Sequence, residues 1–160
     1  MTGTAGCFKD VQGVIREAYK HLEPGGTLQV ADFDLSPQRA DGTCSHNDPV
    51  FQFFQRHTTA AAELKRPISI VPQYDEMMKA AGFNVLKHEV IKVPTNPWQR
   101  DEMGQKIGRF MEEVITGDPE GMFKDRMVRG LGEVPEQVDL DCVTIRSHLK
   151  DRQNRIYFPL

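Results

Sequence analysis

Two acidic residues, Asp32 and Asp34, close a predicted strand over residues 27–35. Open α/β sheets bind their ligands at the carboxyl ends of strands, so this position is suited to chemistry. Side chains two residues apart on a strand point the same way, and paired carboxylates can raise one another's pKa. We therefore take Asp32 as a candidate catalytic residue. The other interpretation is a pair of solvated acids that opens a loop.

An imidazole follows an aromatic cluster in a helix predicted over residues 48–66. Phe53, Phe54 and His57 fall on one face of that helix. Such a face can cover a small-molecule cavity and donate a hydrogen bond to a carbonyl or carboxylate, which makes the helix a candidate lid and His57 a candidate catalytic residue. A buried, hydrogen-bonded histidine is the alternative. The substrate-binding residues predicted from this helix are Phe51, Phe54 and Arg56.

Methionine and aromatic side chains gather in the predominantly helical block over residues 98–153. Because methionine is flexible and polarisable, such residues form either an adaptable core or a deformable cavity. The second interpretation gives a substrate side that accepts a hydrophobic molecule. The candidate substrate-binding residues here are Trp98, Met103, Phe110, Met111 and Met127.

The hydrophobic pattern divides residues 1–160, taken as one domain, into units that position these side chains. Residues 1–7 are expected to be a flexible start. Gly26 and Gly82 end helices, since glycine tolerates the backbone conformation found there. The pattern predicts an α/β fold with a small sheet of two or three strands. The units are a helix–strand unit over 8–35, the lid helix over 48–66, a helix–strand unit over 72–93, the helical block over 98–153 and the beginning of a strand over 155–160.

The composition limits the kinds of partner that we expect this chain to bind. With 20 basic and 23 acidic residues, the net charge is −3, and no basic stripe suits nucleic acid. No apolar run approaches the roughly 20 residues that cross a bilayer, and the first residues lack the pattern of a signal peptide. We therefore expect a cytoplasmic protein that binds neither nucleic acid nor membrane.

The cysteines and histidines do not form a metal-ligand pattern. His46, His57 and His88 lack metal-ligand spacing, so we expect no metal. The cysteines are odd in number and widely spaced, which excludes a disulfide framework and favours reduced thiols. They are Cys7, Cys44 and Cys142.

Several motifs in order resemble fungal LaeA-like methyltransferases, which are class I S-adenosylmethionine (SAM)-dependent enzymes. The resemblance spans roughly residues 8–160 and implies the C-terminal half of a Rossmann-like methyltransferase fold, truncated here. It also implies that the strand end at Asp32 lies near the transferred methyl group. The motifs are Leu22-Glu-Pro-Gly-Gly26, Asp41-Gly-Thr43, Ala80-Ala-Gly-Phe83, Val93-Pro-Thr-Asn-Pro-Trp-Gln-Arg-Asp101 followed by Gly104, Ile145-Arg-Ser-His-Leu-Lys-Asp-Arg152 and Ile156-Tyr-Phe-Pro159.

The sequence departs from that family where the cofactor binds. In that family, a glycine-rich turn follows the first strand and an acidic residue follows the second. Neither motif occurs in this chain. Its early glycine pair, Gly3-Thr-Ala-Gly6, follows no apolar strand. We therefore expect no SAM and no other cofactor. Without the remaining strands, the strand over 27–35 would expose an edge. We expect a homodimer through this strand or through the helical block.

Three functions fit these expectations. The first is a catalyst of natural-product biosynthesis that folds a terpenoid or polyketide for cyclisation, cycloaddition or isomerisation without SAM. The second is a non-catalytic regulatory or partner module of a methyltransferase. The third is a SAM-dependent methyltransferase completed by another chain or represented by a truncated gene model.

Overall fold

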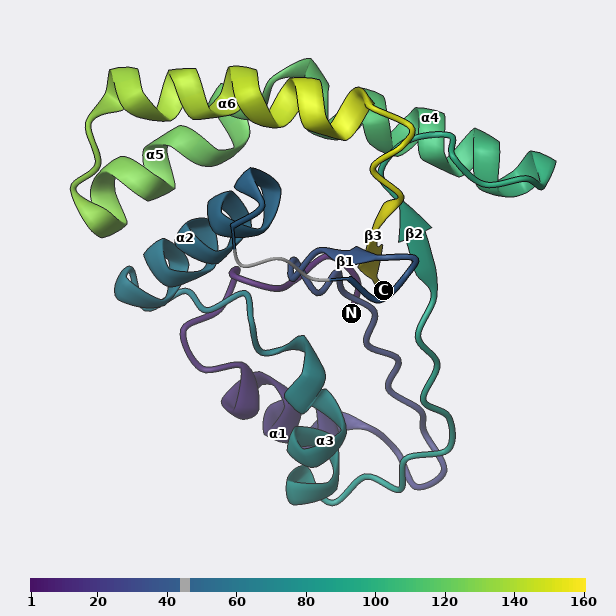
Figure 1. Ribbon diagram of the computed structural model, residues 1–160. Coiled ribbons are helices and arrows are strands. Elements are labelled where there is room, and N and C mark those ends of the chain that lie inside the picture. The colour runs from purple at the N-terminus through teal and green to yellow at the C-terminus, as the bar shows by residue number, and fades with distance from the viewer. Residues whose placement is uncertain (44–46) are drawn as a thin grey trace.

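The last residues of the chain form the central strand of a small sheet, as the pattern over 155–160 predicts. The computed structural model describes residues 1–43 and 47–160. Strand β3 (Ile156–Pro159) lies between β1 (Gln38–Arg39) and β2 (Lys92–Pro94) and is antiparallel to both. With six helices around these three strands, the described residues confirm the mixed α/β class (Figure 1).

Four helices cover one side of the sheet. They are α2 (Pro49–Glu63), α4 (Glu102–Gly117), α5 (Pro119–Leu131) and α6 (Pro135–Lys150). The helix start predicted at Asp48-Pro49 is confirmed: the Asp48 side chain accepts a hydrogen bond of 2.8 Å from the Val50 N–H. Proline also begins α5 and α6, where its missing N–H costs no helical hydrogen bond.

An aromatic cluster fills the main core between α2, α5 and the sheet. The Phe53 and Phe54 rings stand edge-on to Phe123 at centroid distances of 5.3 and 5.6 Å, and Phe54 contacts Phe158 of β3 at 4.9 Å. All four side chains are buried. The helix expected to be a lid thus lies inside the core, because its aromatic face packs against two other elements.

A second, smaller core lies on the other side of the sheet. Helix α1 (Val11–His21) packs against α3 (Tyr74–Ala81), which follows a short 3₁₀ turn (Val71–Gln73). Figure 1 shows this pair below the sheet, away from α4, α5 and α6. Gly82 ends α3 in the left-handed conformation, with φ +104°, as the sequence predicts.

The two long strands predicted from the sequence are wrong. Residues 27–35 contain only an isolated bridge between Thr2 and Ala31, and the paired strand in this region is the short β1. Of residues 83–93, only the last two belong to β2. Both segments stretch out beyond the paired part of the sheet (Figure 1). Residues 1–7, expected to be a flexible start, hydrogen-bond to the first segment instead.

None of the described helices combines the length and the apolar character needed to cross a membrane.

We expect Gly130→Ala to destabilise the fold, because a Cβ there would lie 2.5 Å from the Ala60 carbonyl oxygen of α2. Overpacking of this kind costs about 1–3 kcal/mol. The control is Gly117→Ala at the end of α4, where the nearest atom would be 3.9 Å away. Thermal unfolding should show a fall of several degrees for the first variant only. An unchanged Tm in Gly130→Ala would contradict the α2–α5 contact.

Candidate functional site

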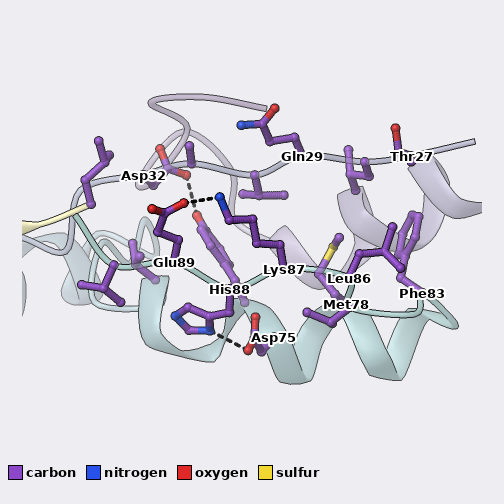
Figure 2. A pocket seen from close by; sticks show the side chains of 18 of the residues that line it. Thr27, Gln29, Asp32, Asp75, Met78, Phe83, Leu86, Lys87, His88 and Glu89 are labelled. Carbon is purple, nitrogen blue, oxygen red and sulfur yellow. Dashed lines mark hydrogen bonds and ion pairs between the residues drawn. The ribbon is translucent and has the colours of Figure 1, made fainter.

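An open groove lies between the two stretched-out segments, beyond the end of β3. Its volume is about 1350 Å³, and residues 27–32 and 84–90 form its two walls. Residues of α1 and α3 complete the lining, and Figure 2 shows side chains from both walls facing one another. Leu28, Val30 and Leu86 make much of this lining apolar. The groove is much larger than a second cavity of about 280 Å³ between α2 and α6, and it is our candidate site.

Asp32 is the one predicted site residue that lines this groove. Only 2% of the Asp32 surface is exposed. Its carboxylate accepts three hydrogen bonds. The Thr4 backbone N–H donates one, the Thr4 hydroxyl donates a second at 2.9 Å, and the Tyr74 hydroxyl donates a third at 2.7 Å. The carboxylate therefore joins the start of the chain and α3 to the groove wall, and it is held rather than free.

Burial raises the pKa of Tyr74, and the hydrogen bond to Asp32 and the charge of that carboxylate raise it further. The phenol therefore stays protonated at neutral pH and keeps donating. Asp34, the second acid of the predicted pair, instead accepts a hydrogen bond of 3.0 Å from the Ser36 N–H. The two carboxylates thus have different roles: Asp32 connects a hydrogen-bond network, whereas Asp34 stabilises a turn.

His57 lies in the main core, not in the groove. It is 2% exposed and contacts Phe123 at 4.9 Å between ring centroids. Arg126 donates a hydrogen bond of 2.9 Å to the ring Nε2, so the hydrogen lies on Nδ1, which has no hydrogen-bond partner among the described residues. Burial and the nearby Arg126 cation lower the pKa of His57 to about 4. The ring is therefore neutral at physiological pH.

The other predicted site residues lie apart from the groove. Arg56 forms ion pairs with Asp141 and, at 3.7 Å, with Glu133. The half-buried Trp98 donates from Nε1 to the Ile156 carbonyl oxygen at 3.0 Å. Met103 and Phe110 are 65% and 68% exposed on α4. The remaining residues are the half-buried Phe51 and the buried core residues Phe54, Met111 and Met127.

Charged side chains on the second wall are paired with each other. Lys87 forms an ion pair with Glu89, and His88 contacts Asp75 of α3 at 2.6 Å (Figure 2). The charges of the first pair cancel each other, but the lining also includes Glu23, Asp32, Asp34 and Asp75, so acidic side chains outnumber lysines in the groove. Sequence patterns did not single out Tyr74, because its partner Asp32 lies 42 positions away along the chain.

The glycine pair nearest to a cofactor-binding turn is Gly3 and Gly6, and both have positive φ. Three N–H groups of this stretch are used within the chain: Gly3 donates to Ala31, Thr4 to Asp32, and Cys7 to the Thr4 carbonyl. These hydrogen bonds fix the start of the chain against the wall at Ala31 and Asp32.

No described residues form a group of three or more side chains arranged to hold a metal ion. Among the described residues, Cys7 is a free, exposed thiol, and Cys142 is free and buried in the main core. Burial raises the pKa of Cys142 to about 11, so it remains a neutral thiol. Cys44 and His46 lie outside the described residues.

Fold and groove together define a mixed α/β module with an open groove beside its small sheet. Comparison with known proteins confirms the resemblance to fungal methyltransferases. The chain is 31% identical over 99 residues to the probable methyltransferase tdiE of Emericella nidulans, covering 62% of this chain and 31% of that protein. It is 27% identical to the protein-methionine methyltransferase laeA of Chaetomium globosum, covering 90% of this chain and 46% of the relative.

A third relative is the secondary metabolism regulator laeA of Aspergillus fumigatus. It is 24% identical to this chain, covering 89% of the chain and 38% of the relative. The chain thus spans less than half the length of each of these three curated relatives. No family model matches the chain, and no solved structure matches it.

We expect Tyr74→Phe to lower the free energy of unfolding by about 1.5–3 kcal/mol, because the buried Asp32 carboxylate loses a donor. Tyr19→Phe is the matched control: Tyr19 is half exposed, and its ring contact with Phe83 survives the change. Urea denaturation of both variants measures the difference. Equal stabilities would mean that the Asp32 network does not hold α3 in place.

The buried His57 should make folding sensitive to acid. Its pKa is near 6.5 in the unfolded chain and about 4 in the folded one. Between these two pH values, His57 is protonated in the unfolded chain and neutral in the folded one. Its contribution to the free energy of unfolding is therefore complete above pH 6.5 and is lost as the pH falls toward 4. The loss attributable to this residue is about 3 kcal/mol.

Urea denaturation at several pH values tests this on His57→Gln, with exposed His21→Gln as the control. The slope of stability against pH between 6.5 and 4.5 should flatten in His57→Gln and remain in the control. The comparison of slopes holds even if His57→Gln is less stable at every pH. An unchanged slope would show that His57 is accessible to protons in the folded state.

Proposed function

We propose that this chain serves a methyltransferase-like function in fungal natural-product biosynthesis, as the substrate-side part of a catalyst whose methyl-donor site another polypeptide supplies. The observation that carries the proposal is the similarity to fungal methyltransferases, of whose length this chain spans less than half. The hydrogen-bonded turn at Gly3 and Gly6 agrees with this division.

A hydrophobic acceptor fits the surface that α4 presents. Met103, Ile107, Phe110 and Val114 follow one another at helical spacing, and all four are exposed. Exposed apolar stripes of this kind mark sites for hydrophobic ligands or for other proteins. Met103 and Phe110 therefore remain candidate substrate contacts in the assembled catalyst, rather than in a cavity of this chain alone.

SAM-free cyclisation, cycloaddition or isomerisation is the second candidate. It draws on the apolar groove, with Asp32 and Tyr74 among its lining residues, as a place to fold a terpenoid or polyketide. Its difficulty is access, because the carboxylate is buried and fully hydrogen-bonded. A regulatory role is the third candidate, favoured by the name of the Aspergillus fumigatus relative.

Deletion of the gene in its host, followed by mass spectrometry of the metabolites, separates the three candidates. If the proposal holds, one compound disappears and a precursor lighter by about one methylene accumulates. A precursor of unchanged mass would overturn it in favour of cyclisation or isomerisation. Changes spread over many unrelated compounds would overturn it in favour of regulation. In calorimetry, the isolated chain should not bind SAM, and micromolar binding would show a donor site of its own.

A further inference from the structure

Arg126 of α5 differs from the other half-buried lysine and arginine side chains in the described part of the chain. Each of the others forms an ion pair with a carboxylate; they are Arg39, Arg56, Lys124 and Arg146. Arg126 forms no ion pair within residues 1–43 and 47–160. A charge that is partly withdrawn from water is costly unless an opposite charge compensates it. The Arg126 guanidinium is therefore suited to an anion that comes from outside these residues.

The hydrogen bond to His57 holds Arg126 in place without neutralising it. Arg126 donates from Nη1 to His57 Nε2 at 2.9 Å. The imidazole ring is neutral at physiological pH, so it contributes no negative charge. A guanidinium has five N–H donors in one plane, and this hydrogen bond uses one of them. The other donors can bind two oxygen atoms of one anion, as arginine does with carboxylates and phosphates.

The second terminal nitrogen of Arg126 lies beside the turn at Gly6. A Cβ at Gly6 would lie 3.8 Å from Arg126 Nη2 and 2.7 Å from the Ile68 side chain. Glycine also tolerates the φ of +79° found at this position. Among the residues that the structure describes, neither Ala5 nor Gly6 uses its backbone N–H in a hydrogen bond. Successive N–H groups in such turns bind anions, so the turn offers donors next to the guanidinium.

Arg66 brings a second guanidinium to the same turn. It donates from Nη1 to the carbonyl oxygen of Cys7, the residue after Gly6. Arg66 is exposed and has no ion-pair partner in the described ranges, and the same holds for the exposed Lys9 and Lys65 close to it along the chain. Positive charge therefore gathers around this turn.

The carboxylates nearest along the chain do not neutralise these cations. Asp10 accepts a hydrogen bond of 2.7 Å from the Gly13 N–H at the start of α1. Asp125 forms an ion pair of 3.1 Å with Arg129. Glu63, the last residue of α2, is exposed and pairs with no cation of the described chain. The turn thus keeps an excess of positive charge in a chain whose net charge is −3.

We propose that Arg126, Arg66 and the turn at Gly6 bind a phosphate group, either of a small metabolite or of free inorganic phosphate. Two guanidinium charges match the nearly doubly charged phosphate better than a singly charged carboxylate. Arg126 provides the fixed, half-buried contact and Arg66 the exposed one. The site is independent of the proposed function, because it requires neither a methyl donor nor the surface of α4.

Titration calorimetry of the full chain with inorganic phosphate at low salt tests this proposal. We expect Arg126→Gln to weaken binding at least roughly tenfold, because charge-assisted hydrogen bonds are lost. Arg66→Gln should weaken binding severalfold, and since Arg66 is exposed, this variant serves even if Arg126→Gln does not fold. The matched control is Arg129→Gln, one turn further along α5, where the exposed charge is already paired with Asp125. The control should bind phosphate as the unaltered chain does.

An absence of phosphate binding by the unaltered chain would overturn the proposal. So would equal affinities in Arg126→Gln, Arg66→Gln and Arg129→Gln, because overall charge and not this site would then attract the anion. Acetate that binds as tightly as phosphate would contradict the preference for a doubly charged ligand. Glycerol 3-phosphate separates the two sources: tighter binding than inorganic phosphate assigns the site to a phosphorylated metabolite, and weaker binding assigns it to free phosphate. The metabolite test of the proposed function can fail without changing any of these results.

Discussion

The pairing of β3 with both of its neighbours is the interaction that holds the sheet of this structure together. A sheet is held by hydrogen bonds between neighbouring backbones, and a central strand satisfies both of its neighbours at once. Strands β1 and β2 are regular where they pair with β3, which spans Ile156–Pro159. The segments 27–35 and 83–91 lack such regular pairing, although their composition is that of strands.

The sheet divides the molecule into two unequal parts. The main core, with Phe53, Phe123 and Phe158, is closed by four helices and the paired part of the sheet, so its packing does not depend on the groove. The small core around Ile15 and Tyr74 is linked to the sheet chiefly through the open walls. Leu28 and Val30 of the first wall pack against it.

Local signals explain what the sequence predicts well, and distant partners explain what it misses. Asp48-Pro49 and Gly82 act within one helical turn, so both helix boundaries can be read directly. An apolar run over 27–35 has the composition of a strand, but a strand exists only beside a neighbour, which the local pattern does not reveal. The bond between Tyr74 and Asp32 spans 42 positions, and that between Arg126 and His57 spans 69. No spacing rule reaches so far.

The positions of Asp32 and His57 explain why the two candidate catalytic residues do not form one site in this chain. A carboxylate that exchanges protons must reach its substrate, and Asp32 is surrounded by Thr4 and Tyr74 donors within the wall. The neutral His57 ring lies in the main core, separated from the groove by its contacts with Phe123 and Arg126. The accessible apolar surface of α4 is therefore the better place for a substrate to meet the completed catalyst.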